Sequence, residues 1–162
     1  MSTRFARSIA LPMLFALGAC AAPQPHHSAA DLSAAGRAVG DRFLEAFNKA
    51  DVDGVMATYW HSPELVYFGL DGMGMRGWDA VRADMVATFQ MLPHAKFEFL
   101  ERHDDPHGDV VVGWGTWRVT VPGASGAKPT VLEGRFTDLK AFRDGKWVYI
   151  LDHPSVPMAA PK

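Results

Sequence analysis

The sequence predicts an α+β fold in which helices come first and antiparallel strands follow. Between positions 31 and 92, apolar side chains recur every three or four residues, which is the spacing of amphipathic helices. From position 95 onward they alternate with polar residues in long runs separated by turn residues. The chain has 162 residues, 48% of them hydrophobic and 21% charged, which suits one domain with a buried core.

Three helices are expected in the first half. The first rests on four apolar residues that share one face: Leu32, Val39, Phe43 and Phe47. Asp51 is the predicted N-cap of a short second helix, and Pro63 ends that helical pattern. A short strand at 65–68 and a glycine-rich return at 69–77 then precede the third helix. The apolar stripe of this helix consists of Trp78, Val81, Met85, Phe89 and Leu92.

Four strands are expected in the second half. Residues 95–103 alternate through Phe97 and Phe99, and residues 104–108 (DDPHG) are typical of a turn. Long strands at 110–121 and 130–142 flank a loop at 122–129. Asp144-Gly145 is a hairpin dipeptide, so the last strand is expected at 147–153.

Charge and cysteine content exclude several classes of function. Sixteen Lys and Arg against 18 Asp and Glu give a formal net charge of −2, so the chain lacks the basic excess that nucleic-acid binding requires. A single cysteine excludes a disulfide framework and a multi-cysteine zinc site. We therefore predict no nucleic-acid partner, no metal and no cofactor.

The first 20 residues resemble a bacterial lipoprotein signal peptide. Arg4 and Arg7 precede an apolar run at 9–17 that is too short to span a bilayer. The run ends in LGAC at 17–20, which is similar to the lipobox, and this resemblance implies that Cys20 is lipidated and becomes the mature N-terminus. The alternative is an ordinary signal peptide with a chance cysteine. Because Ala21, and not an aspartate, follows the cysteine, we expect an outer-membrane anchor facing the periplasm.

The expected organisation is therefore a signal peptide at 1–19, the lipidated cysteine and a flexible tether at 20–30, a domain at 31–157 and a tail at 158–162. Within the domain, three segments resemble the NTF2-like superfamily: ATYWHSPELVYFG at 57–69, GMGMRGWDAV at 72–81 and GRFTDLKAFRDGKWVYILDHPS at 134–155. The sequence is most similar to SnoaL-like and DUF4440-type domains and to the association domain of calcium/calmodulin-dependent kinases. The resemblance implies a cone, in which a curved antiparallel sheet wraps around about three helices and encloses an apolar pocket, and a homodimer formed through the outer sheet face.

The resemblance also assigns roles to two positions. Ketosteroid isomerases of this superfamily have a carboxylate base on the first strand, where this sequence has Phe68. They also use a protonated aspartate, followed four residues later by phenylalanine, as Asp138 is followed by Phe142. A carboxyl group in an apolar cone shifts toward its neutral form and can donate a hydrogen bond, so Asp138 is a candidate catalytic residue. Alternatively, Asp138 pairs with Arg118 or Arg135 on a neighbouring strand.

Alternation along the strand at 110–121 groups Trp114 and Thr116 on one face and Trp117 on the other. The resemblance to the kinase association domain implies that Thr116 faces the ligand. We therefore predict that Trp114 and Thr116 form the pocket wall, with core packing as the alternative.

Five further residues complete the candidate site. His153 matches the recurrent histidine of the family in an H-x-S motif and is the second candidate catalytic residue, as an acid or base. Alternatively, it ties the end of the strand to a backbone carbonyl. Its neighbour Asp152 points to the opposite face and is a candidate ligand-binding residue. Tyr59, Tyr67 and Trp78 are expected at the cone mouth, where phenol and indole groups donate to a ligand.

Three functional hypotheses follow. The first is an envelope lipoprotein whose domain binds a small, largely apolar molecule. The second is an isomerase, cyclase or dehydratase that uses Asp138 and His153 for general acid–base catalysis without a metal. The third is a dimeric assembly module. Phe68 at the base position argues against the enzyme, whereas Asp138 argues for a ligand with a polar group.

Overall fold

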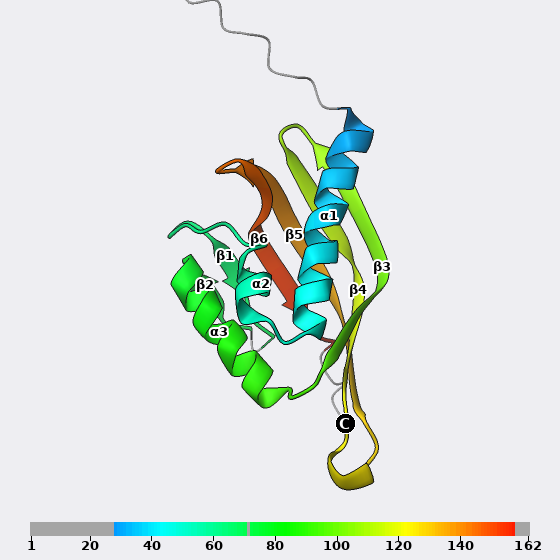
Figure 1. Ribbon diagram of the computed structural model, residues 1–162. Helices are drawn as coiled ribbons and strands as arrows, with labels where there is room; N and C mark the ends of the chain where they lie inside the picture. Colours follow the sequence, from blue (N-terminus) through cyan, green and yellow to red (C-terminus); the bar gives the residue numbers. More distant parts are fainter. Residues whose placement is uncertain (1–27, 71, 158–162) are drawn as a thin grey trace, which may run out of the picture.

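The computed structural model describes residues 28–70 and 72–157 (Figure 1). The helices are α1 (Ala29–Asn48), α2 (Val52–Met56) and α3 (Trp78–Met91), with a 3₁₀ turn η1 (Ala124–Gly126). The strands are β1 (Val66–Phe68), β2 (Gly74–Arg76), β3 (Lys96–His107), β4 (Val110–Val121), β5 (Thr130–Arg143) and β6 (Lys146–Ser155). The predicted α+β class is confirmed, as is the order of the three helices and five strands that were expected. Strand β2 lies within the expected glycine-rich return, where no strand was predicted.

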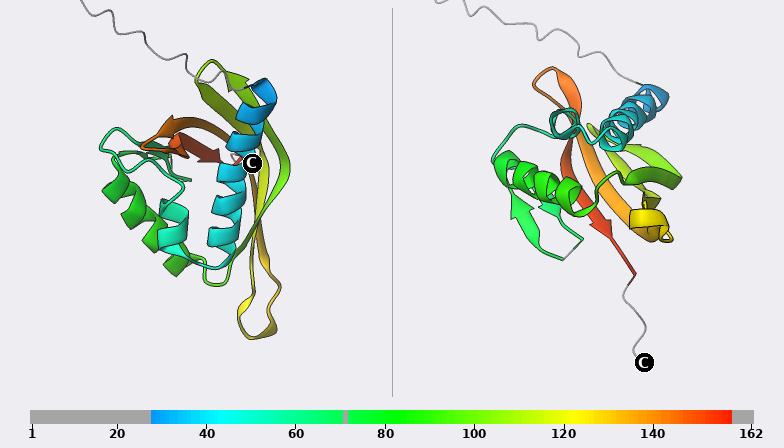
Figure 2. Two further views of the ribbon diagram at one scale, coloured as in Figure 1. Left: turned by 45° about the horizontal axis from the view of Figure 1, so that its top comes forward. Right: turned by 60° about the horizontal axis from the view of Figure 1, so that its bottom comes forward.

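The six strands form one sheet in the order β2-β1-β6-β5-β4-β3. The sheet curves around α1 without closing into a barrel (Figure 2). Strands β3 to β6 form the expected antiparallel meander, but β1 pairs parallel with β6, so the sheet is mixed and not purely antiparallel. The alternation of a three-residue strand carries no information on pairing direction. The sequence pattern therefore could not show this difference.

Local capping explains where the first two helices begin. Ser28 accepts a hydrogen bond from the Asp31 backbone N–H while Asp31 accepts from the Ser28 backbone, a reciprocal capping box. The helix therefore starts at Ala29, and residues 28–30 belong to its start and not to the expected tether. Asp51 caps α2 as predicted, accepting from the Gly54 N–H at 2.9 Å.

The expected turn at 104–108 is wrong, because β3 continues to His107 and the chain reverses at residues 108–109. Asp104 is buried and ion-paired, which holds this segment in the sheet. Pro106 is compatible with the strand because β3 is an edge strand, where one backbone N–H need not be paired. At the next hairpin the prediction is confirmed: Asp144 and Gly145 both have positive φ (50° and 81°), as a type I′ turn requires.

The helices divide the concave face of the sheet between them. α1 crosses β3 and β4, whereas α2 and α3 lie toward β1 and β2 (Figures 1 and 2). A core of aliphatic and aromatic side chains fills the space where α1, α2 and the sheet meet, and includes Val39, Phe47, Val55, Met56 and Tyr59.

The predicted signal peptide, Cys20 and the expected tail at 158–162 lie outside the described residues. Within the described part of the chain, no helix combines the length and apolar character needed to cross a membrane.

Candidate functional site

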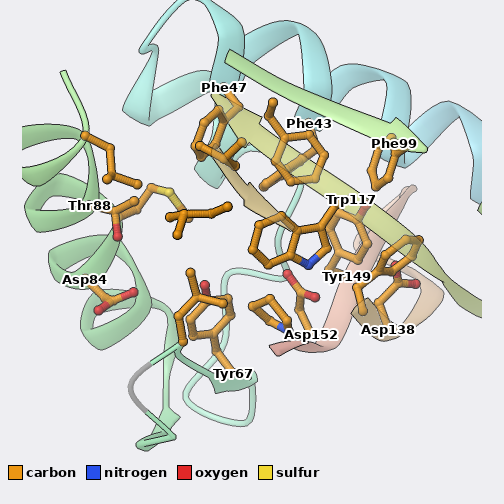
Figure 3. A pocket seen from close by; sticks show the side chains of 18 of the residues that line it. Phe43, Phe47, Tyr67, Asp84, Thr88, Phe99, Trp117, Asp138, Tyr149 and Asp152 are labelled. Carbon is orange, nitrogen blue, oxygen red and sulfur yellow. The ribbon is translucent and has the colours of Figure 1, made fainter. Parts of the chain in front are cut away.

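A cavity of about 300 Å³ lies between α3, the C-terminal half of α1 and the concave face of the sheet (Figure 3). Its walls are mainly aromatic. The rings come from six elements, namely Phe43 and Phe47 on α1, Tyr67 on β1, Phe97 and Phe99 on β3, Trp117 on β4, Phe136 on β5 and Tyr149 on β6. This size and lining are typical of sites for small organic molecules.

Two carboxyl groups form the polar end of the cavity. Asp138 on β5 and Asp152 on β6 are direct cross-strand partners and face the same side of the sheet (Figure 3). Side chains opposite each other in this way have Cβ atoms about 5 Å apart. Two acids are therefore held side by side in an apolar environment.

Asp152 accepts hydrogen bonds from neutral donors, the Tyr59 hydroxyl and the His153 backbone N–H. The Tyr59 hydroxyl donates to Asp152 Oδ2 at 2.6 Å, and part of the Asp152 surface faces the cavity. Burial raises the pKa of Asp152 to about 7, and the neighbouring Asp138 carboxylate adds to the shift, whereas the Tyr59 hydrogen bond and Lys140 oppose it. Asp152 is therefore poised to hold or release a proton near neutral pH.

Asp138 belongs to a chain of buried charges that extends away from the cavity. Asp138 is 2% exposed, and Lys140 Nζ lies 2.7 Å from its Oδ1. Lys140 also donates to Asp104 Oδ1 at 2.8 Å, and Arg102 Nε donates to Asp104 Oδ2 at 3.1 Å. Burial raises the pKa of Asp138, and Lys140 counters that shift. Gly113 leaves the space that these buried charged groups occupy, because a Cβ there would overlap the Asp138 carboxylate and the Lys140 ammonium.

Three of the predicted site residues line the cavity: Tyr67, Asp138 and Asp152. The alternative of Asp138 paired with Arg118 is not observed, because Arg118 binds Glu98 and Glu133 on the convex face. Whether Asp138 is catalytic stays a prediction.

The predicted pocket wall of Trp114 and Thr116 is wrong. Trp114 is 41% exposed on the convex face, where its indole stacks on His103 and donates to Asp105, and neither Trp114 nor Thr116 lines the cavity. The opposite face of β4 lines the cavity with Trp117, which the prediction assigned to the other side. On that inner face the positions beside Trp114 and Thr116 are glycines, which leave room for large inward side chains of β5.

His153 also lies outside the cavity. It is exposed, and its ring contacts Phe68 with centroids 5.1 Å apart. Phe68 points to this outer side and its neighbour Tyr67 faces the cavity, so the inward position of β1 has a phenol and not a carboxylate. Asp138 and His153 therefore do not form one catalytic pair.

Two predicted mouth residues are already engaged in the fold. The Tyr59 hydroxyl is used by Asp152, and the ring is 1% exposed beneath the cavity wall. The Trp78 indole N–H donates to the Met56 carbonyl at 3.2 Å, and its ring packs on His61. Neither residue lines the cavity, so the expected place at its mouth is wrong for both.

Trp117 and Lys140 are site residues that the sequence did not predict. Trp117 is opposite Gly134, which leaves space for the indole, and its N–H donates to the Arg135 carbonyl at 3.0 Å. The glycine opposite Trp117 could have indicated that the indole points inward, but the strand register is needed to know that the two residues are opposite each other. Lys140 is 1% exposed, and its i, i+2 spacing from Asp138 puts both on one face of β5.

His103 and His107 have the i, i+4 spacing that brings two metal ligands together on a helix. Both residues lie in the strand β3, where this spacing separates them. Among the described residues, no group of three or more His, Cys, Asp or Glu side chains is arranged to hold a metal ion.

Solved structures show the same fold. An association-domain protein from Xanthomonas campestris, provisionally assigned to calcium/calmodulin-dependent protein kinase II, is 20% identical with a TM-score of 0.67, covering 86% of this chain and 95% of its own. An NTF2-like superfamily protein from Salmonella enterica is 19% identical with a TM-score of 0.65 (76% and 89%). A protein from Streptomyces avermitilis, provisionally described as a dehydratase of the NTF2-like family, is 12% identical with a TM-score of 0.70 (78% and 96%).

At these identities the structures establish the fold alone. No curated protein matches the chain in sequence. Residues 41–150, which contain α2, α3, Asp138 and most of the sheet, match the family described as the SnoaL-like domain. The chain belongs to the SnoaL-like domain family, with the NTF2-like fold.

Proposed function

We propose that the domain binds a small, largely apolar molecule in its cavity, with a polar group of that molecule at the end occupied by Asp138 and Asp152. The observation that carries this proposal is the combination of eight aromatic rings with two carboxyl groups around about 300 Å³ of space. A core built only for stability fills such a volume, because each unfilled methyl-sized space costs about 1 kcal/mol.

The test uses N-phenyl-1-naphthylamine, a neutral apolar dye whose fluorescence rises in apolar sites. We expect the purified protein to bind the dye and Thr88→Phe to abolish that binding, because the Thr88 side chain lines the cavity and the larger ring fills it. Gln90→Phe is the matched control, since Gln90 is exposed on the same helix and lies outside the cavity lining. Equal dye binding by both variants would contradict the proposal.

A second candidate function is proton transfer on a small organic substrate, as in isomerases, cyclases and dehydratases. Asp152 favours it, because a carboxyl group with a pKa of about 7 in an apolar cavity is well matched to general acid–base work at neutral pH. In this version Asp152 replaces His153 as the proton-transfer group, and Asp138 stabilises developing charge nearby.

This candidate predicts a measurable exchange reaction. The protein should accelerate deuterium incorporation next to the carbonyl of 2-tetralone, a neutral apolar ketone, as followed by proton NMR in D₂O. Asp152→Asn should abolish the acceleration while leaving dye binding intact. Exchange at the buffer rate with the parent protein would remove the enzyme from consideration and leave the binding function in place.

The proposed setting is the bacterial envelope, with Cys20 as the lipid anchor. Acyl chains supply the membrane affinity of such proteins, so Cys20→Ser should release the protein from membranes. Equal membrane recovery of the variant and the parent would argue against the anchor.

The proposed homodimer would use the convex face of the sheet. That face exposes Trp114 and also the ion cluster of Arg118 with Glu98 and Glu133. Sedimentation of the protein in detergent as a monomer at tens of micromolar would contradict this assembly.

A further inference from the structure

We propose that the ligand of the cavity is a cationic amine: a molecule with an apolar body and one positively charged nitrogen, which lies against Asp152. This inference rests on the function proposed above and names the chemical class of the ligand.

The charged lining of the cavity has one sign. Asp138 and Asp152 lie at its polar end, and Asp84 on α3 lines the wall across from them (Figure 3). Among the described residues that line the cavity there is no Lys, Arg or His. An anionic ligand would therefore meet carboxyl groups without a cation in the lining, whereas a cation would be attracted to the polar end.

The buried charges behind the cavity leave one negative charge without a cationic partner. Arg102 pairs with Asp104 at 3.1 Å, and Lys140 lies 2.7 Å from Asp138 and 2.8 Å from Asp104. Three buried carboxyl groups thus share two cations. Asp152 is the third, and its hydrogen-bond donors, the Tyr59 hydroxyl and the His153 backbone N–H, are neutral.

The two carboxyl groups at the polar end differ in their access to the cavity. Asp138 Oδ1 is fully enclosed, with Lys140 Nζ 2.7 Å away. Asp152 is partly exposed, lines the cavity and accepts from the neutral hydroxyl of Tyr59. A cation in the cavity therefore lies against Asp152.

The aromatic lining suits a cation as well as an apolar body. Tyr67 and Tyr149 line the cavity, and both pack on the buried Tyr59 that donates to Asp152, with centroids 6.4 Å and 5.1 Å from its ring. Ring faces attract ammonium groups in sites that exclude water, and a carboxylate at the centre of such a cluster strengthens that attraction. Lys140 already uses this property inside the fold, because its Nζ lies 5.1 Å from the centre of the Tyr149 ring.

In the free protein a proton takes the place of the missing cation. Burial and Asp138 raise the pKa of Asp152 to about 7, so an arriving ammonium group displaces that proton and binds more tightly as the pH rises through 7. The ionisable groups that face Asp152 from the surrounding elements are Asp138 and Lys140 on β5, Tyr59 after α2, Tyr67 on β1, Tyr149 on β6 and Asp84 on α3.

The test compares two molecules of nearly the same shape, 3-phenylpropylamine and 3-phenylpropan-1-ol, as competitors of N-phenyl-1-naphthylamine. The amine is charged from pH 5.5 to 8, and the alcohol is neutral. At pH 8 we expect the amine to displace the dye at a concentration about tenfold or more below that of the alcohol, as one charge-assisted contact implies. At pH 5.5 this preference should shrink, because Asp152 then holds its proton.

Two variants locate the effect. Asp152→Asn should remove most of the amine preference and its pH dependence, while the alcohol and the dye still bind. Asp105→Asn is the matched control, because Asp105 is exposed on the convex face, and it should behave as the parent.

The possible outcomes distinguish the cationic ligand from the binding function on which this inference rests. Equal displacement by amine and alcohol at both pH values would overturn the cationic ligand and leave the apolar binding site standing. An amine preference that survives Asp152→Asn would also overturn it. If calorimetry detects no binding of the dye, the amine or the alcohol, the binding function itself falls, and this inference with it.

Discussion

The two halves of the concave sheet face are built in opposite ways. In the closed half, the first turns of α1 lie directly on β3 and β4: a Cβ at Gly36 would overlap Val111, and one at Gly40 would overlap the Arg102 guanidinium. Ser33 donates to the Asp104 carbonyl at 2.6 Å, which fixes the helix to the edge strand. The hollow half lies between α3 and β4–β6, where aromatic side chains surround the cavity.

This difference separates charges with a structural role from charges left for a ligand. In the closed half, Asp104 has both Arg102 and Lys140 within 3.1 Å, and Arg102 also reaches Asp41 at the surface. In the hollow half, Asp152 has a phenol and a carboxyl neighbour. Burial favours the protonated form of a carboxyl group, and a cation beside the group opposes that shift. We therefore expect substitutions in the closed half to change mainly the free energy of unfolding. Substitutions in the hollow half should change its pH dependence and the binding of ligands.

The largest effect is expected from Lys140→Met. Lys140 is 1% exposed and joins the two halves, so its loss leaves Asp104 and Asp138 short of a cation in a buried site. Removing one partner of a buried pair typically costs about 3–5 kcal/mol, which urea unfolding at pH 7 measures. Arg118→Met is the control, because Arg118 pairs with two glutamates on the exposed convex face, where a pair contributes up to about 1 kcal/mol. Equal losses would show that the buried chain has no special role.

The second effect is the loss, in Asp152→Asn, of the pH dependence of stability that Asp152 causes. The pKa of Asp152 is raised from 3.8 to about 7, so the folded state binds the proton more tightly than the unfolded state. Between about pH 4 and 7 the folded protein holds more protons, and the contribution of Asp152 to stability falls as the pH rises through this window. Asn keeps an acceptor for Tyr59 and carries no charge.

Parent and variant should therefore be close in stability at pH 4, whereas at pH 8 the variant should be the more stable by about 2–4 kcal/mol, the scale of a shift of this size. Urea unfolding at both pH values measures the difference. A variant that is less stable than the parent at pH 8 would mean that Asp152 is ionised and well paired in the fold.

The third prediction adds one methyl group to each half. Gly36→Ala places a Cβ against Val111 and should destabilise the fold by about 1–3 kcal/mol through overpacking. Val119→Ile adds the same group toward the cavity, where space exists, and should change stability by less than about 0.5 kcal/mol. Thermal unfolding of both variants measures the contrast, and equal destabilisation would argue that the hollow half is as tightly packed as the closed half.

The sequence predicts local features of the fold better than it predicts the cavity. Helix positions, the Asp51 cap and the Asp144-Gly145 hairpin are local features, and each was predicted from neighbouring residues. The cavity depends on which face of each strand turns inward, and alternation gives two faces without saying which is which. On β5 the resemblance selected the correct face for Asp138. On β4 it selected the wrong face for Thr116, and alternation placed Trp114 on that same face.

The error on β4 has a physical source. Its inner face has Gly113, where Asp138 and Lys140 of β5 occupy the space, and Gly115, where the Glu101 carbonyl of β3 and the Phe136 ring do so. The residues with the most conspicuous side chains therefore point to solvent. The buried chain from Asp138 to Arg102 was also missed, since it joins residues 36 positions apart along the sequence at contacts that only the register reveals.

The smallest effect tests this assignment of faces with one substitution made twice. Trp117→Phe removes the indole N–H that donates to the Arg135 carbonyl and part of the cavity wall, so binding of N-phenyl-1-naphthylamine should weaken by about threefold or more, since a lost hydrogen bond and aromatic contact are each worth up to about 1 kcal/mol. Trp114→Phe removes an indole that donates to Asp105 on the convex face, and the dye affinity should stay within about twofold of the parent, well under 1 kcal/mol. Fluorescence titration of the two variants measures both values. A larger loss from Trp114→Phe would place the binding surface on the convex face, and the comparison between the two halves of the concave face would then no longer describe where this protein binds its ligand.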